Sequence, residues 1–228
     1  MTLILFFVIL RKLNTILKKT KMKSYKTLFI ALLLLHTSLF AQKYTTLNIR
    51  QKMPMEEVEI FDISEESMTL NENLKSNGIL VVFTSNSCPF VVMWEDRYKL
   101  LEEKCMKSGF GMVYINSNQA KRDGDDSVEE MRNHSKKMGY NFPYLIDENS
   151  KLANVFGAKT TPHIFLFNGE KKLAYKGAID DNYKSINNVT KSYLLDALEE
   201  VSNQRSVSIN DTKAVGCSIK RVKKIKDK

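Results

Sequence analysis

The stretch that decides the fold is residues 78–107, GILVVFTSNSCPFVVMWEDRYKLLEEKCMK. It opens on a continuous apolar run with several β-branched residues, which is typical of a strand covered on both faces. Pro89 follows Cys88 directly and predicts the first position of a helix, where proline is favoured. Four large apolar or thiol side chains in that helix recur at spacings of 4, 3 and 4 and predict one buried stripe: Trp94, Tyr98, Leu101 and Cys105. The stretch therefore predicts a buried strand, a turn that carries one thiol, and a helix.

Outward from this unit, strands alternate with helices. Strands are predicted at 58–63, 110–115 and 142–146, and helices at 127–138 and 150–156. Two further strands, 160–167 and 172–178, are joined by Asn168-Gly169, a strong signal for a tight hairpin turn. A last helix is predicted at 189–203. This order indicates an α/β fold: a central mixed sheet flanked by helices, ending in a β-hairpin and a helix.

The first 41 residues predict a leader. Residues 22–41 contain two early lysines, an apolar run at 28–35 and the small residue Ala41 at the end, which are the three parts of a secretory signal. We expect Met22 to be the true start and cleavage to follow Ala41, so that the protein is exported to the periplasm or secreted. The alternative is an uncleaved N-terminal anchor. Export would place the chain where disulfides persist, although three cysteines are too few for a disulfide-stapled scaffold.

The net charge of +9 comes from the two ends of the chain. Residues 1–41 carry seven basic and no acidic residues, and residues 220–228 carry six basic and one acidic residue. The body, 42–219, has 22 basic and 25 acidic residues. A nucleic-acid-binding domain carries its positive charge on the folded body, so this class is excluded. The domain prediction is a leader at 1–41, one domain at 42–210, and a basic, cysteine-containing tail at 211–228.

The motif SNSCPFV at 85–91 resembles the redoxin branch of the thioredoxin superfamily, often labelled with the alkyl-hydroperoxide-reductase and thiol-antioxidant group. The resemblance covers roughly residues 55–220 and includes five further short segments: 114–118, 143–147, 161–162, 177–181 and 216–220. It implies a thioredoxin-like fold and redox chemistry at cysteine.

Cys88 falls where that family places its nucleophilic cysteine. A thiolate is the attacking species, and a helix N-terminus, with its partial positive charge, lowers the pKa of a thiol placed there. Pro89 would keep the helix starting in register behind the sulfur. The alternative interpretation of Cys88 is a small buried core residue.

The resemblance also implies roles for two other segments, Thr161-Pro162 and the segment around Cys217. It implies that the peptide bond before Pro162 is cis and that this loop packs against the nucleophilic sulfur. Thr161 would then offer backbone groups to an extended substrate chain or an attacking thiol. The Gly-Cys-x-Ile-Lys ending implies that Cys217 is a resolving cysteine, which would form a Cys88–Cys217 disulfide. Cys217 is expected to lie in an exposed tail beyond the last helix, and the alternative to a resolving role is a free or structurally bonded thiol there.

The chain departs from the family pattern beside Cys88. Val91 stands where thioredoxins carry a second cysteine, and Ser85 and Ser87 stand where many relatives carry cysteine and histidine. The local dithiol is therefore absent. Ser85 also removes a two-cysteine copper site, and we expect neither a metal nor a cofactor.

The remaining chemistry-bearing residues are expected to be structural. His163 is predicted to be a strand residue that points away from the site, and His134 a surface residue of a polar helix. Cys105 belongs to the apolar stripe and is predicted to lie in the core. Asp180 and Asp181 are predicted to form a solvated turn.

Three functions stay open at this stage. The first is a thiol–disulfide oxidoreductase that acts on a protein disulfide with an external thiol donor. The second is a thiol peroxidase, because peroxiredoxins place Thr or Ser three residues before the attacking cysteine, where Ser85 stands; they also carry a proline where this chain has Val81. The third is a non-catalytic binding module that keeps the fold. In each, we expect no nucleic acid partner and no membrane insertion after leader cleavage.

Overall fold

The computed structural model describes residues 44–222. The predicted leader, with its start at Met22 and its cleavage after Ala41, lies outside the described residues, as do residues 223–228. Within 44–222, no helix is both long enough and apolar enough to cross a membrane.

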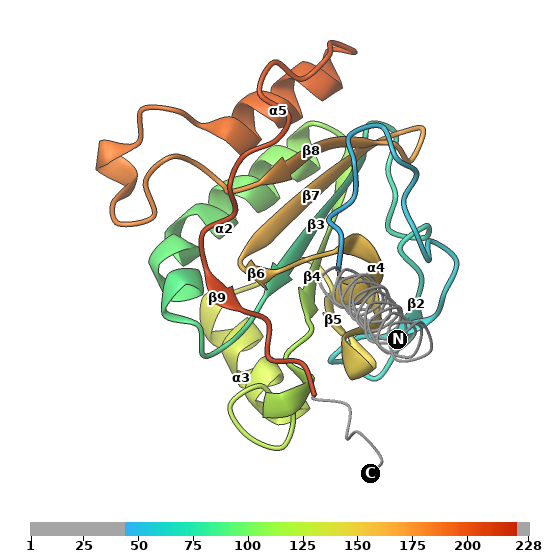
Figure 1. Cartoon of the computed structure of the whole chain (residues 1–228), viewed down its shortest axis with the longest axis vertical. Helices are drawn as coiled ribbons and strands as arrows, with labels where there is room; N and C mark the ends of the chain where they lie inside the picture. Colours follow the sequence, from blue (N-terminus) through green and yellow to red (C-terminus); the bar gives the residue numbers. More distant parts are fainter. Residues whose placement is uncertain (1–43, 223–228) are drawn as a thin grey trace, which may run out of the picture. The chain divides into compact units, whose positions relative to one another are not determined.

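A five-stranded mixed sheet forms the centre of the described domain (Figure 1). Its strands, in spatial order, are β5 (Tyr144–Ile146), β4 (Phe110–Asn116), β3 (Gly78–Thr84), β7 (His163–Asn168) and β8 (Leu173–Gly177). β3, β4 and β5 are parallel, whereas β7 runs antiparallel to β3 and β8 antiparallel to β7. The mixed sheet with a terminal hairpin is thus confirmed.

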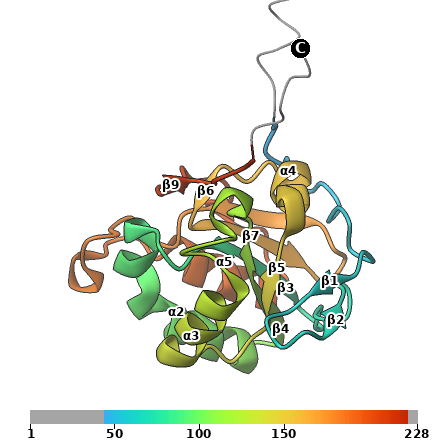
Figure 2. The same ribbon diagram turned by 90° about the horizontal axis from the view of Figure 1, so that it is seen from below.

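Helices cover both faces of this sheet, with α2 and α3 on one side and α4 on the other (Figure 2). The first face packs against α2 (Pro89–Lys107), α3 (Val128–Met138) and α5 (Tyr193–Ser202). The second packs against α4 (Lys151–Phe156) and the segment before β3. Leu80 and Val82 face the first layer, and their neighbours along β3 face the second, because strand side chains alternate. Every residue of β3 is buried, as its apolar run predicts.

The helix ends follow the signals in the sequence. Pro89 occupies the first turn of α2, and the predicted apolar stripe is at most 1% exposed at Trp94, Tyr98, Leu101 and Cys105. Ser127 caps α3, since its side-chain oxygen accepts a hydrogen bond from the backbone N–H of Glu130. These local signals therefore position Cys88 at one end of a well-buried helix.

Two strand predictions differ clearly from the structure. The predicted strand at 58–63 shrinks to β1 (Ile60–Phe61), which pairs with β2 (Ser67–Met68). The chain turns after β1 because the Asp62 carboxylate accepts hydrogen bonds from the backbone N–H groups of Ser64 and Tyr144. The predicted strand at 160–167 is divided at Pro162 into β6 (Thr160–Thr161) and β7.

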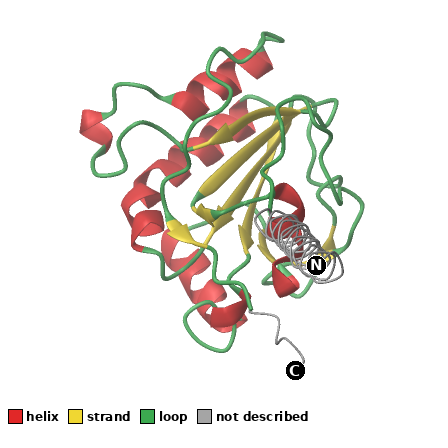
Figure 3. Ribbon diagram, viewed as in Figure 1, coloured by secondary structure: helices red, strands yellow, loops and turns green. Residues whose placement is uncertain are grey.

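The predicted helix at 189–203 begins four residues late. Asp181 accepts hydrogen bonds from the backbone N–H and side-chain hydroxyl of Thr190, and these bonds hold residues 189–191 in a loop. Only a short 3-10 turn, η3 (Ile186–Asn188), interrupts the loop between β8 and α5 (Figure 3). Two further 3-10 turns are η1 (Gln119–Lys121) and η2 (Glu148–Ser150).

The described part of the predicted tail packs along the domain. Thr212 Oγ1 bonds with the Tyr175 hydroxyl at 2.7 Å and accepts from the Ala178 N–H at 3.0 Å. Strand β9 (Cys217–Ser218) then pairs antiparallel with β6. Cys217 is accordingly half-buried, which differs from the exposed tail expected from the sequence.

Candidate thiol site

Cys88 is the N-cap residue of α2 and is only 4% exposed. In its thiol form, its Sγ donates a hydrogen bond to the carbonyl oxygen of Thr161 at 3.0 Å. The Thr161–Pro162 peptide bond is cis. The structure therefore brings together three of the residues singled out in the sequence, at the meeting point of α2 and β6.

Cys217, in the C-terminal segment, lies beside these same residues. It lies directly opposite Thr161 in the β6–β9 pair, and both its thiol and that of Cys88 are free. Burial raises the pKa of Cys217, and a hydrogen bond with the Cys88 side chain and the negative charge of Cys88 raise it further. The Phe90 N–H at the start of α2 and Lys220 act in the opposite direction. These interactions favour the thiol form of Cys217.

Alkylation of Cys217 should follow this raised pKa. Because thiolates are the reactive form, labelling by iodoacetamide should rise only at a pH above that of an ordinary thiol, about 8.5. In Cys88→Ser the interaction with the Cys88 charge is removed while burial remains, so the midpoint should move to lower pH. Mass spectrometry of the labelled peptide across a pH series measures the midpoint. An identical midpoint in Cys105→Ala and in Cys88→Ser would mean that the two sulfurs do not interact.

Gly216 allows β9 to approach β6. A Cβ atom at this position would stand 2.2 Å from the Thr161 carbonyl oxygen, far inside van der Waals contact. That oxygen is the one that accepts the Cys88 hydrogen bond. A residue without a side chain is therefore needed just before Cys217.

We expect Gly216→Ala to push β9 away from Thr161 and to slow formation of a Cys88–Cys217 disulfide by about tenfold or more, since intramolecular rates fall steeply with misplacement. Gly124→Ala is the matched control, because a Cβ there would meet nothing closer than 3.9 Å. Rates of disulfide formation under limiting oxidant, followed by alkylation and mass spectrometry, distinguish the two variants. Equal rates in both would show that β9 tolerates displacement.

Ser85 supports the turn before Cys88. Its hydroxyl donates to the Asp126 carboxylate at 3.1 Å and accepts from the Ser87 N–H at 3.3 Å. The hydroxyl proton is therefore directed at Asp126 and not at the Cys88 sulfur. The sequence analysis missed Asp126, because the run Asp123-Gly124-Asp125-Asp126 has no pattern that separates its one fully buried carboxylate from its exposed neighbours.

The predictions for the two histidines had different outcomes. His163 is 5% exposed, packs against Phe165 in the layer opposite α2, and accepts a hydrogen bond from the Lys159 N–H, so it points away from the site as predicted. Burial lowers the pKa of His163 to about 3, with help from Lys176 and Lys159. The prediction for His134 was wrong: its side chain is 15% exposed and bonds with the buried Glu95.

The prediction of a solvated turn was wrong for Asp180. Asp180 is 6% exposed and accepts hydrogen bonds from Arg97 Nε at 3.0 Å and Trp94 Nε1 at 3.2 Å. It therefore anchors α2 to the loop after β8, because its two partners lie on the helix. Asp181 is exposed, as expected. Cys105 is fully buried, as predicted, and burial together with Glu102 raises its pKa to about 12.

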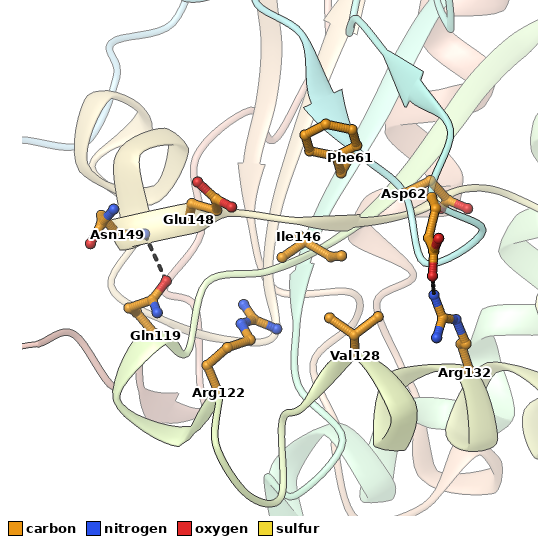
Figure 4. Close-up of a pocket in the computed structure, with 10 residues that line it drawn as sticks. Phe61, Asp62, Gln119, Arg122, Val128, Arg132, Ile146, Glu148 and Asn149 are labelled. Carbon is orange, nitrogen blue, oxygen red and sulfur yellow. Dashed lines mark hydrogen bonds and ion pairs between the residues drawn. The ribbon is translucent and has the colours of Figure 1, made fainter.

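A separate pocket lies between β1, β5 and α3 (Figure 4). Two arginines, Arg122 and Arg132, face a lining that also includes the carboxylates of Asp62, Glu65 and Glu148. Neither Cys88 nor Cys217 lines it. Across residues 44–222, no group of three or more His, Cys, Asp or Glu side chains is arranged to hold a metal ion.

Several solved structures of other proteins are similar to this chain. A hypothetical protein of Sinorhizobium meliloti 1021 is 30% identical, with a TM-score of 0.71 over 78% of this chain and 97% of that one. An uncharacterized conserved protein of Geobacillus kaustophilus is 28% identical, with a TM-score of 0.72 over 80% and 96% of the two chains. Peroxidoxin BcpB of Mycobacterium tuberculosis is 14% identical, with a TM-score of 0.51 over 72% and 99%, and shares the fold.

No curated protein matches the chain significantly. The AhpC/TSA family, in contrast, matches residues 49–176, which include β3, Cys88, α2 and Thr161-Pro162. The mixed sheet and its flanking helices form a thioredoxin-like fold. The sequence match, the fold and the thiol at the start of α2 agree, and the chain belongs to the AhpC/TSA family of the thioredoxin-like superfamily.

Proposed function

We propose that the protein is an exported thiol–disulfide oxidoreductase in which Cys88 and Cys217 are the redox pair. The proposal rests on the arrangement of the two cysteines around the backbone carbonyl of Thr161. Cys88 donates to the Thr161 oxygen, and Cys217 lies directly opposite Thr161 in the neighbouring strand. Two thiols that are 129 positions apart in the chain therefore meet at the start of one helix.

The reaction follows from the chemistry of thiolates. The Cys88 thiolate attacks one sulfur of a substrate disulfide, forms a mixed disulfide, and releases the other substrate sulfur as a thiolate. Cys217, after losing its proton, then attacks the Cys88 sulfur. The Cys88–Cys217 disulfide forms, and the second substrate thiolate leaves. An external dithiol returns the pair to the reduced state and is itself oxidised to a disulfide.

Strand β9 controls access to Cys88 in this scheme. Cys88 is 4% exposed with β9 in place, so a bulky substrate reaches it only when the segment moves. β9 itself is two residues long and pairs with β6, whereas Ile219 and Lys220 just after it are held by hydrogen bonds to Lys159, Asn118 and Ala120. Its return after substrate attack would deliver Cys217 to the mixed disulfide. In this scheme the same short segment excludes substrate at rest and resolves the intermediate.

The supporting residues have distinct proposed roles. Pro89 starts α2 behind the sulfur, and Thr161 with Pro162 supplies the carbonyl that orients the Cys88 thiol. Ser85 holds the preceding turn. A thiol peroxidase is the second candidate, but the Ser85 hydroxyl is directed at Asp126, which favours disulfide exchange. We propose export on the basis of the leader-like residues 22–41.

Peptide mass mapping of the form beginning at Gln42 tests the redox pair. After treatment with limiting oxidised glutathione, we expect a peptide in which Cys88 and Cys217 are joined, and dithiothreitol should separate it. Cys105 should stay free because it is fully buried. Three free thiols, with Cys88 unreactive toward oxidants and alkylating agents, would contradict the proposal and favour a non-catalytic binding module.

A further inference from the structure

The Asp126 carboxylate is buried beneath the turn that precedes Cys88. It is 0% exposed and lies in the loop just before α3. Three of its hydrogen-bond donors belong to that turn: Ser85 Oγ at 3.1 Å, the Asn86 N–H at 2.9 Å and Ser87 Oγ at 3.4 Å. One side chain thus fixes three consecutive residues, and the next residue is Cys88.

The same carboxylate is connected to the strand that carries Cys217. Asn118 donates from Nδ2 to Asp126 at 2.9 Å, and its Oδ1 accepts from the Lys220 N–H at 2.8 Å. Lys220 lies three residues after Cys217, and its carbonyl accepts from the Ala120 N–H at 2.8 Å. Two hydrogen bonds therefore separate Asp126 from the C-terminal strand segment.

The chemistry of this site requires a carboxylate. Asn116 Nδ2 also donates to Asp126, at 2.7 Å, so five groups donate to an acceptor with about four lone-pair sites. An amide in its place would turn an N–H₂ group toward some of these donors and break their bonds. Arg122 lines the separate pocket in Figure 4. Its guanidinium supports the Asp126 site by donating hydrogen bonds to the backbone carbonyl oxygens of Asp126 and Asn116, both at 2.8 Å.

We propose that Asp126 is a positioning residue for the thiol pair. It holds the Cys88 turn directly and the Cys217 strand through Asn118, so that each sulfur is presented to the other at a high effective concentration. This inference rests on the proposed exchange between Cys88 and Cys217. Asp126 itself touches neither sulfur and takes no part in bond making.

The test is the equilibrium between the protein and glutathione. One oxidised glutathione converts the two protein thiols to the Cys88–Cys217 disulfide and leaves two reduced glutathione molecules, so the equilibrium constant measures effective concentration. We expect Asp126→Asn to lower this constant by about tenfold or more relative to the unmodified protein. Alkylation of free thiols in a series of glutathione mixtures, read by mass spectrometry, gives the constant.

Glu102→Gln is the matched control. Glu102 is also a buried carboxylate, 2% exposed, and accepts from the Tyr114 hydroxyl and Asn141, but it lies toward the C-terminal end of α2. We expect this variant to lower the urea midpoint of unfolding and to leave the glutathione equilibrium unchanged. A purely structural role for Asp126 would give the same pattern for Asp126→Asn, which would overturn the inference.

Asn118→Ala provides a milder second variant if Asp126→Asn does not fold. It removes the connection to Lys220 and leaves Asp126 bound to the Cys88 turn, so the constant should fall in the same direction by a smaller factor. An unchanged constant in this variant, with the disulfide still forming, would refute the connection through Asn118 while the proposed function stands. Failure of the unmodified protein to form the disulfide would refute the proposed function itself.

Discussion

Replacing Cys88 by serine should reduce disulfide exchange by roughly 10³-fold or more, the scale on which loss of an attacking nucleophile reduces the rate of an enzyme. A hydroxyl at this position cannot form the mixed disulfide, and neither of the other two cysteines lies at the start of α2. Reduction of insulin disulfides with dithiothreitol as donor measures the rate. Turnover of hydrogen peroxide, measured in parallel, tests the second candidate function with the same variant.

Cys105→Ala is the control for this experiment. Cys105 is fully buried in the stripe of α2 and has no role in the proposed exchange. We expect the variant to lose stability, by about 1 kcal/mol on the scale of a small cavity, while its exchange rate per folded molecule stays the same. Activity that survives Cys88→Ser and disappears in Cys105→Ala would contradict the assignment of Cys88.

Replacing Cys217 by serine should instead trap the intermediate. Cys88 can still attack a substrate disulfide, but no neighbouring thiol resolves the product, so the mixed disulfide should accumulate toward one per chain. Turnover should fall by about 10-fold to 100-fold, because an external thiol must replace an intramolecular one whose effective concentration is about millimolar or higher. Intact mass spectrometry after reaction with excess oxidised glutathione detects the trapped adduct.

The two cysteine variants together determine the order of attack. If the adduct accumulates on Cys88 in Cys217→Ser, Cys88 attacks first. If it accumulates only on Cys217 in Cys88→Ser, the partly exposed sulfur attacks first and the proposed order is reversed. Normal turnover in Cys217→Ser would remove Cys217 from the reaction and leave β9 as a structural strand.

The fold was largely predictable because its signals are local. The apolar run of β3, Pro89 after Cys88 and the hairpin turn at Asn168-Gly169 each determine an element through a few neighbouring residues. Boundaries set by distant partners were not predictable. The late start of α5 depends on Asp181, and the end of β1 depends on the hydrogen bond that the Tyr144 N–H donates to Asp62.

The same distinction separates the predicted and the missed site residues. Cys88, Thr161 and Cys217 were predicted from motifs, and the structure brings them together. Asp126 could not be recognised, because its partners come from segments up to 41 positions away and its neighbours in the chain are equally acidic. Asp180 was misjudged for a similar reason, since Arg97 and Trp94 lie more than 80 positions before it.

The contacts of Trp94 make it an intrinsic fluorescent probe. Trp94 is the single tryptophan of the chain, so ultraviolet excitation of indole selects one fluorophore. The centre of the Trp94 ring lies 5.8 Å from that of the Tyr183 ring, and the Tyr183 ring lies 5.1 Å from the Phe90 ring. The backbone N–H of Phe90 in turn interacts with the Cys217 sulfur. We therefore expect oxidation of the thiol pair to change the emission of this one indole, which can be followed in real time without a dye or a coupled assay.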